Sequence, residues 1–167
     1  MDTRKMVRLS LLVAVATVLS ILENQLPIPR PFPWLKLGLA NAITLVALMM
    51  YGTRAAVTVA CMRALLAGLF GAFFMLLFSL PAAAVSSLSM GFLHRISGRR
   101  LSVIGLSVSG AVIHNLTQLL VAYFALNLNR SSIMALAPFL ILAAVLAGVI
   151  TGLLARYLIR RVMPEQG

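Results

Sequence analysis

Residues 133–159 read IMALAPFLILAAVLAGVITGLLARYLI, and the stretch from Ile133 to Ala155 holds no charged residue. A helix that crosses the hydrocarbon core of a bilayer needs about 20 consecutive, predominantly apolar residues. This stretch therefore predicts a membrane-spanning helix near the end of the chain.

Five further apolar runs precede this one, and they are separated by charges or by clusters of proline and glycine. The six predicted spans cover approximately residues 6–23, 36–51, 54–78, 80–94, 101–126 and 133–159. The second and fourth are short, and the third can instead end near Gly68–Gly71, with residues 72–79 as a separate interfacial piece. The chain is therefore predicted to be an all-α integral membrane protein, with one transmembrane domain over residues 1–167 and six transmembrane helices.

The composition agrees with a surface that faces lipid. Hydrophobic residues make up 62% of the 167 residues and charged residues only 10%, whereas soluble domains are about half apolar and about a quarter charged. The net charge of +11 would suit nucleic acid, but no long polar face or aromatic-basic groove is present to hold a strand. We therefore expect the lipid bilayer, and no nucleic acid, as a partner. Cys61 is the only cysteine, which excludes an intrachain disulfide and zinc sites built on cysteine pairs.

Basic residues divide unequally between the two sides of the predicted membrane protein, and Lys and Arg favour cytoplasmic loops. With six spans and a cytoplasmic N-terminus, ten of them fall inside: Arg4, Lys5, Arg8, Arg54, Arg95, Arg99, Arg100, Arg156, Arg160 and Arg161. Only Arg30, Lys36 and Arg130 fall outside, and Arg63 lies within a span. The sequence therefore predicts a multi-pass protein of a bacterial-type cell membrane, with both termini in the cytoplasm.

The end of the first span has two unusual features. The apolar run after Arg8 imitates a signal peptide, but Glu23-Asn24-Gln25 follows it where a cleavage site needs small residues. We therefore expect a retained first helix. The connection over residues 25–34 contains Pro27, Pro29, Pro31 and Pro33. These prolines make it extended and stiff, either as a rigid linker or as a lid over an outward-facing cavity.

Small residues recur at four-residue spacing in two of the spans. Gly148 and Gly152 lie in the last span, and Ser10 and Ala14 lie in the first. Such spacing lets two helices approach closely in a membrane. The close approach can occur within this chain or against a partner membrane subunit.

The polar residues within the spans form the candidate ligand site. Polar groups at membrane depth are costly and usually face an interior or a cavity. The set, with Lys36 at its rim, is Glu23, Lys36, Asn41, Arg63, His114, Asn115 and Gln118. Counted at about 1.5 Å per helical residue, these groups fall between the midplane and the outer leaflet. Their shared depth predicts one pocket for a small-molecule ligand.

The charges in this set allow two interpretations. Arg63 keeps its charge, and Glu23 is the one acid in the membrane that can pair with it. Alternatively, Arg63 and Lys36 bind an anionic ligand, with Asn41 and Gln118 as neutral hydrogen-bonding groups. The two arrangements can coexist. His114 can be a packing residue, a ligand contact or, least favoured, a metal ligand, and Asn115 can serve a neighbouring helix. We expect no catalytic residue, no bound metal and no cofactor.

Three motifs resemble a known family. They are Leu22-Glu23, Lys36-Leu37-Gly38-Leu39-Ala40-Asn41 and His114-Asn115-x-x-Gln118. These motifs, with Arg63, resemble the Gx transporters, also called heptaprenyl diphosphate synthase component I, over nearly the whole chain. That family is similar to the substrate-binding S components of energy-coupling-factor (ECF) transporters. This likeness implies a six-helix bundle, a ligand near the outer leaflet, a transmembrane coupling subunit and cytoplasmic ATPases. No vitamin-specific signature is visible, so the resemblance implies no particular ligand.

The synthase label disagrees with the acidic residues. Polyprenyl synthases bind magnesium diphosphate through aspartate-rich motifs, because a hard cation prefers carboxylate oxygens, and this chain has one aspartate, Asp2. It also lacks the G-x-x-x-x-G-K-[ST] pattern of ATPases. We therefore expect a non-enzymatic substrate-binding subunit for an anionic or amphipathic ligand. The alternative is a non-catalytic membrane component that accompanies a polyprenyl diphosphate synthase, quinone metabolism or membrane electron transfer.

Overall fold

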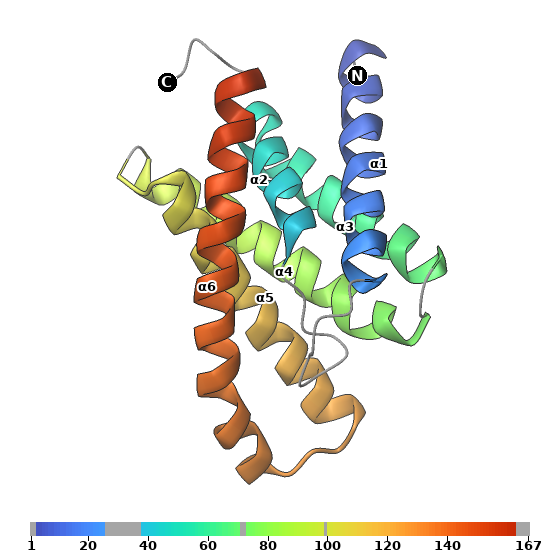
Figure 1. Cartoon of the computed structure of the whole chain (residues 1–167), viewed down its shortest axis with the longest axis vertical. Helices are drawn as coiled ribbons and strands as arrows, with labels where there is room; N and C mark the ends of the chain where they lie inside the picture. The colour runs from blue at the N-terminus through green and yellow to red at the C-terminus, as the bar shows by residue number, and fades with distance from the viewer. Residues whose placement is uncertain (1–2, 26–37, 71–72, 99, 163–167) are drawn as a thin grey trace.

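The computed structural model describes residues 3–25, 38–70, 73–98 and 100–162, and over these ranges all regular secondary structure is helical (Figure 1). The helices are α1 (Thr3–Gln25), α2 (Leu39–Tyr51), α3 (Thr53–Phe70), α4 (Phe73–Ser97), α5 (Val103–Ala125) and α6 (Arg130–Val162). Five of them are long and apolar enough to cross a membrane, and α2 is the shorter exception. The predicted all-α membrane bundle is confirmed.

Helix α2 is short because it is surrounded by protein. It has 13 residues, about 20 Å of helix, and it packs against α1, α3, α5 and α6. Its buried side chains run from Ala40 to Leu48, and Ala40, Ala42 and Ala47 are fully buried. Figure 1 shows α2 between α1 and α6. A helix enclosed in this way need not match the thickness of the bilayer, since lipid does not surround its ends.

The described part of the predicted second span, 36–51, becomes helical at Leu39. Gly38 has φ +78° and precedes the first helical residue, Leu39. That left-handed backbone suits glycine, which has no Cβ. Residues 26–37, which include the four alternating prolines and Lys36, lie outside the described residues.

The predicted boundary between the third span, 54–78, and the fourth, 80–94, is wrong. Helix α3 ends at Phe70, and residues 73–79 belong to α4, which continues through Pro81. A Cβ on Gly68 would lie 2.9 Å from Cβ of Leu76, so the glycine lets the two helices meet closely beside the turn. The alternative end of the third span near Gly68–Gly71 fits these bounds, but a separate interfacial piece at 72–79 does not.

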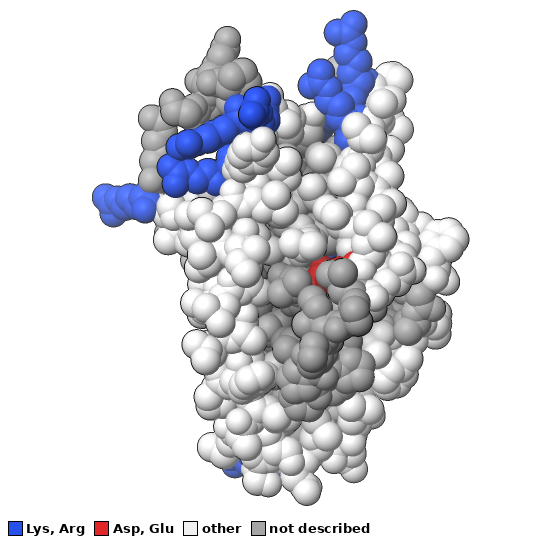
Figure 2. Space-filling model, viewed as in Figure 1, with Lys and Arg blue, Asp and Glu red and all other residues white. Residues whose placement is uncertain are grey.

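The start of α1 and the end of α6 lie at the same end of the bundle (Figure 1). Most of the visible Lys and Arg side chains gather at this end, and the middle of the surface is almost free of them (Figure 2). The exposed side chains in between are large and apolar, such as Leu11, Phe92 and Leu146. This distribution is typical of a bundle whose middle faces lipid. The cytoplasmic placement of this end stays a prediction.

Helices α5 and α6 approach each other through glycine. A Cβ on Gly148 would lie 2.7 Å from Cα of Val108, and one on Gly152 would lie 2.9 Å from Cα of Ile104. Backbone atoms cannot move aside as a flexible side chain can. The Gly148-x-x-x-Gly152 pattern therefore serves packing within this chain, the first of its two predicted uses.

We expect Gly148→Ala to destabilise the bundle by about 1–3 kcal/mol, the usual range for overpacking a tight contact. The added methyl group would push α6 away from the backbone of α5. The measurement is the thermal unfolding temperature (Tm) of the purified protein in detergent. Val149→Ile adds one methylene group at a position 37% exposed on the same helix and is the matched control. Equal Tm values for the two variants would contradict the close contact.

Candidate functional site

Two charged side chains are buried among the described residues. Glu23 on α1 is 1% exposed and Arg63 on α3 is 7% exposed. Burying an isolated charge costs far more than burying a neutral polar group, unless hydrogen bonds and an opposite charge compensate. The contacts of these two side chains therefore define the centre of the bundle.

Glu23 stabilises the start of α2. Its Oε1 accepts a hydrogen bond of 2.6 Å from the backbone N–H of Gly38, and the next turn begins with Asn41 N donating to Gly38 O at 2.7 Å. The first N–H groups of a helix lack partners within the helix and carry a partial positive charge. The Glu23 carboxylate compensates for the missing hydrogen-bond partner and for the partial positive charge, although it comes from a different helix.

Arg63 binds neutral groups on two other helices. Its Nη1 donates to Oγ of Ser20 on α1 at 3.2 Å, and its Nη2 donates to Oδ1 of Asn41 on α2 at 2.8 Å. Glu23 is near enough to stabilise the guanidinium charge electrostatically. Arg63 and Glu23 therefore lie close together, and each also binds other groups.

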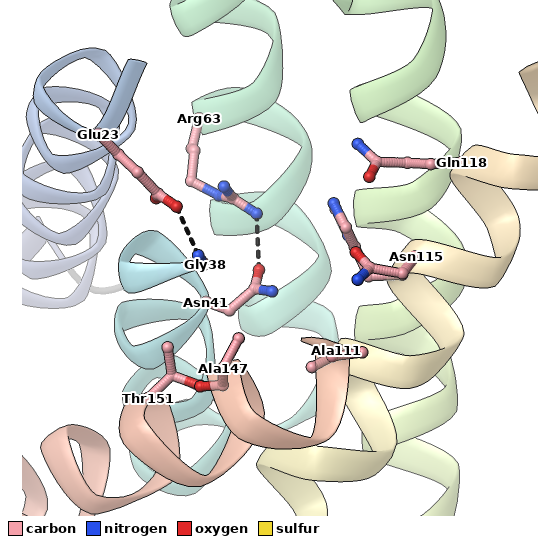
Figure 3. A pocket seen from close by; sticks show the side chains of 11 residues that line it. Glu23, Gly38, Asn41, Arg63, Ala111, Asn115, Gln118, Ala147 and Thr151 are labelled. Atoms are coloured by element: carbon pink, nitrogen blue, oxygen red, sulfur yellow. Dashed lines mark hydrogen bonds between the residues drawn. The ribbon is translucent and has the colours of Figure 1, made fainter. Parts of the chain in front are cut away.

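Six of the seven predicted site residues line one pocket (Figure 3). The lining residues are Glu23, Gly38, Asn41, Arg63, Ala111, His114, Asn115, Gln118, Ala144, Ala147 and Thr151. They come from α1, α2, α3, α5 and α6, together with Gly38, which immediately precedes α2. The seventh predicted residue, Lys36, lies outside the described residues. We call this cavity the central pocket.

The polar residues of α5 hold neighbouring helices as well as lining the central pocket. Nδ1 of His114 lies 3.4 Å from Oγ of Ser86 on α4. Nδ2 of Asn115 donates to the backbone carbonyl of Leu140 on α6 at 3.4 Å. Asn115 therefore serves a neighbouring helix, one of its predicted roles, and also faces the pocket.

Two donors in the central pocket have no hydrogen-bond partner among the described residues. Nε of Arg63 is buried and makes no hydrogen bond. The side-chain amide of Gln118 is 2% exposed, lines the pocket and points toward Arg63 in Figure 3. Buried donors of this kind cost about 1–3 kcal/mol each when nothing accepts their hydrogen. The pocket thus offers hydrogen-bond donors to an acceptor.

The volume of the central pocket is small, about 20 Å³. One water molecule needs about 10–15 Å³ measured in this way, so the pocket holds about one water. A water there can accept from Arg63 or Gln118. A larger molecule fits only when the surrounding helices separate.

Two polar residues of the site were not predicted from the sequence. Ser20 lies three residues before Glu23 on α1, so both face the same side of the helix. Thr151 lines the pocket and exchanges a 2.9 Å hydrogen bond with Ser107. Ser20 could have been found from its helical spacing from Glu23. Thr151 could have been found from its position between Gly148 and Gly152.

Comparison with known proteins gives one match. A family model described as heptaprenyl diphosphate synthase component I matches residues 12–158. No curated protein and no solved structure matches the chain. The matched range includes all six polar residues that line the central pocket and were predicted from the sequence. The chain belongs to the heptaprenyl diphosphate synthase component I family.

Proposed function

We propose that this protein is a membrane-embedded substrate-binding subunit without catalytic activity of its own, similar to the S component of an ECF-type uptake transporter. Its ligand carries an anionic or strongly polar group that enters the central pocket. The observation that carries this proposal is the buried Nε of Arg63, which has no hydrogen-bond partner among the described residues, beside the Gln118 amide that lines the same pocket.

The donors select the chemistry of the ligand. Arg63 provides a permanent positive charge, and its fork of N–H groups suits carboxylate or phosphate oxygens. Asn41 and Gln118 provide neutral amides on either side of it. A ligand oxygen in the pocket would satisfy the donors that the protein leaves open.

Binding a whole molecule requires the pocket to open. Helices α5 and α6 meet through the backbone at Gly148 and Gly152, so a separation there is costly. Helix α1 contributes Glu23 to the described pocket lining, and the Glu23–Gly38 and Ser20–Arg63 hydrogen bonds hold it to its neighbours. We infer that α1 moves relative to α2 when the ligand enters.

We expect Gln118→Leu to abolish ligand retention without loss of stability. Leucine has a similar volume and removes a buried amide that has no partner, so the Tm should stay equal or rise. Gln25→Leu, the same change at an exposed position, is the control. The measurement is mass spectrometry of small molecules extracted from purified protein, together with the Tm. Wild-type retention of the same molecules by Gln118→Leu would remove Gln118 from the binding site.

A face of α1 is available for a membrane partner. Ser10 and Ala14 are exposed, and they lie beside Val7, Leu11 and Val18, which are 63%, 64% and 54% exposed. Short side chains permit a partner helix to approach closely in lipid. We propose that this face receives the transmembrane coupling subunit, with both termini and the ATPases on the cytoplasmic side.

We expect Ala14→Leu to reduce co-purification of the partner at least fivefold while the same small molecules stay bound. Ala135→Leu, at an exposed position on α6, controls for added bulk in lipid. Affinity purification from native membranes followed by protein mass spectrometry measures the amount of partner recovered with each of the two variants. Equal loss of partner and ligand in Ala14→Leu would indicate that the face is needed for folding.

The family description favours a second candidate, a non-catalytic component that accompanies a prenyl diphosphate synthase or quinone metabolism. An isoprenoid diphosphate also has the anionic head and apolar tail that the site and its surroundings would accept. The same purification separates the candidates. Recovery of a coupling subunit with ATPases supports transport, and recovery of a prenyl synthase alone supports the second candidate.

A further inference from the structure

A second, larger cavity lies at the end of the bundle where α1 begins. It has a volume of about 420 Å³, within the range of about 300–1,000 Å³ typical of ligand pockets. Its lining comes from the first turns of α1, the end of α2 and the start of α3, and includes Lys5, Tyr51 and Arg54. Lys5 is 18 residues from Glu23, about 27 Å along α1, so this terminal cavity is separate from the central pocket.

The terminal cavity is positively charged. Lys5 and Arg54 both line it, and none of its described lining residues is acidic. Nζ of Lys5 lies 5.8 Å from the centre of the Tyr51 ring, which holds the ammonium at the cavity wall.

The start of α3 adds three backbone donors. The first hydrogen bond of this helix runs from Ala56 N to Gly52 O at 3.1 Å, so the N–H groups of Thr53, Arg54 and Ala55 have no partner within the helix. All three residues line the terminal cavity. Helix starts bind phosphate oxygens well, because free N–H groups and the positive end of the helix dipole act together.

The hydroxyl group of Tyr51 is a further hydrogen-bond donor at the terminal cavity. Its oxygen is buried and has no hydrogen-bond partner among the described residues, and Tyr51 lines the terminal cavity. A buried hydroxyl without a partner costs about 1–3 kcal/mol. A phosphate oxygen in the cavity would accept its hydrogen.

We propose that the terminal cavity binds a phosphate group, held by Lys5, Arg54, the first N–H groups of α3 and the Tyr51 hydroxyl. At the end of a membrane bundle this group comes either from the head of an anionic phospholipid or from a free phosphate or diphosphate. The proposal is independent of the ligand in the central pocket.

The test uses the purified full chain in detergent, stripped of lipid, and the rise of Tm as a measure of binding. The probes are phosphatidylglycerol, phosphatidylcholine as the zwitterionic control, inorganic pyrophosphate, and sodium chloride at matched ionic strength. The variants are Lys5→Gln with Arg54→Gln, and Tyr51→Phe. Arg160→Gln with Arg161→Gln removes the same charge at the end of α6, outside the lining of the terminal cavity, and is the matched control.

We expect wild type to be stabilised saturably by phosphatidylglycerol or by pyrophosphate, and not by the two controls. Stabilisation by phosphatidylglycerol alone identifies a lipid head group, and stabilisation by pyrophosphate identifies free phosphate. The Lys5/Arg54 variant should bind at least tenfold more weakly and the Arg160/Arg161 variant less than twofold more weakly. Tyr51→Phe keeps both charges and should bind several-fold more weakly, which tests the site even if the double variant folds poorly. No stabilisation of wild type, or an equal loss in the Arg160/Arg161 variant, would overturn the proposal.

Discussion

The bundle depends on two buried charges that hold three helices together. Glu23 on α1 accepts from Gly38 at the start of α2, and Arg63 on α3 donates to Ser20 on α1 and Asn41 on α2. In lipid, a polar group without a protein partner has no water to replace it. The position of α2 therefore follows from these bonds, and alanines such as Ala40 and Ala47 allow its neighbours to pack closely around it.

These contacts bear on two interpretations that the sequence left open. An ion pair alone would direct the donors of Arg63 to Glu23, whereas its guanidinium also donates to a serine and an amide. Glu23 acts on Arg63 through charge and on α2 through a hydrogen bond. A role for Arg63 in ligand binding stays a proposal, and the buried Nε without a partner among the described residues supports it.

Hydropathy alone predicted the helices, because lipid demands about 20 apolar residues from each long span. It failed between α3 and α4, where the turn depends on how closely Gly68 lets Leu76 approach, a contact that no local pattern reports. The grouping of Glu23, Asn41, Arg63, His114, Asn115 and Gln118 in one pocket was predictable, because polar groups in lipid must find one another. The size of the pocket was not, since it depends on how tightly alanines and glycines bring the helices together.

The cost of burying Arg63 bears on its role. Replacing a buried ion pair by apolar side chains of similar volume is often neutral or stabilising, and this bundle already packs through alanine and glycine at most of its contacts. Neutral side chains could join α1, α2 and α3 at lower cost, as Ser107 and Thr151 join α5 and α6. Stability of the fold therefore gives no reason for a guanidinium with an open donor at this depth. Under the proposed function, a ligand acceptor in the central pocket gives one, because it would satisfy the open Nε donor of Arg63.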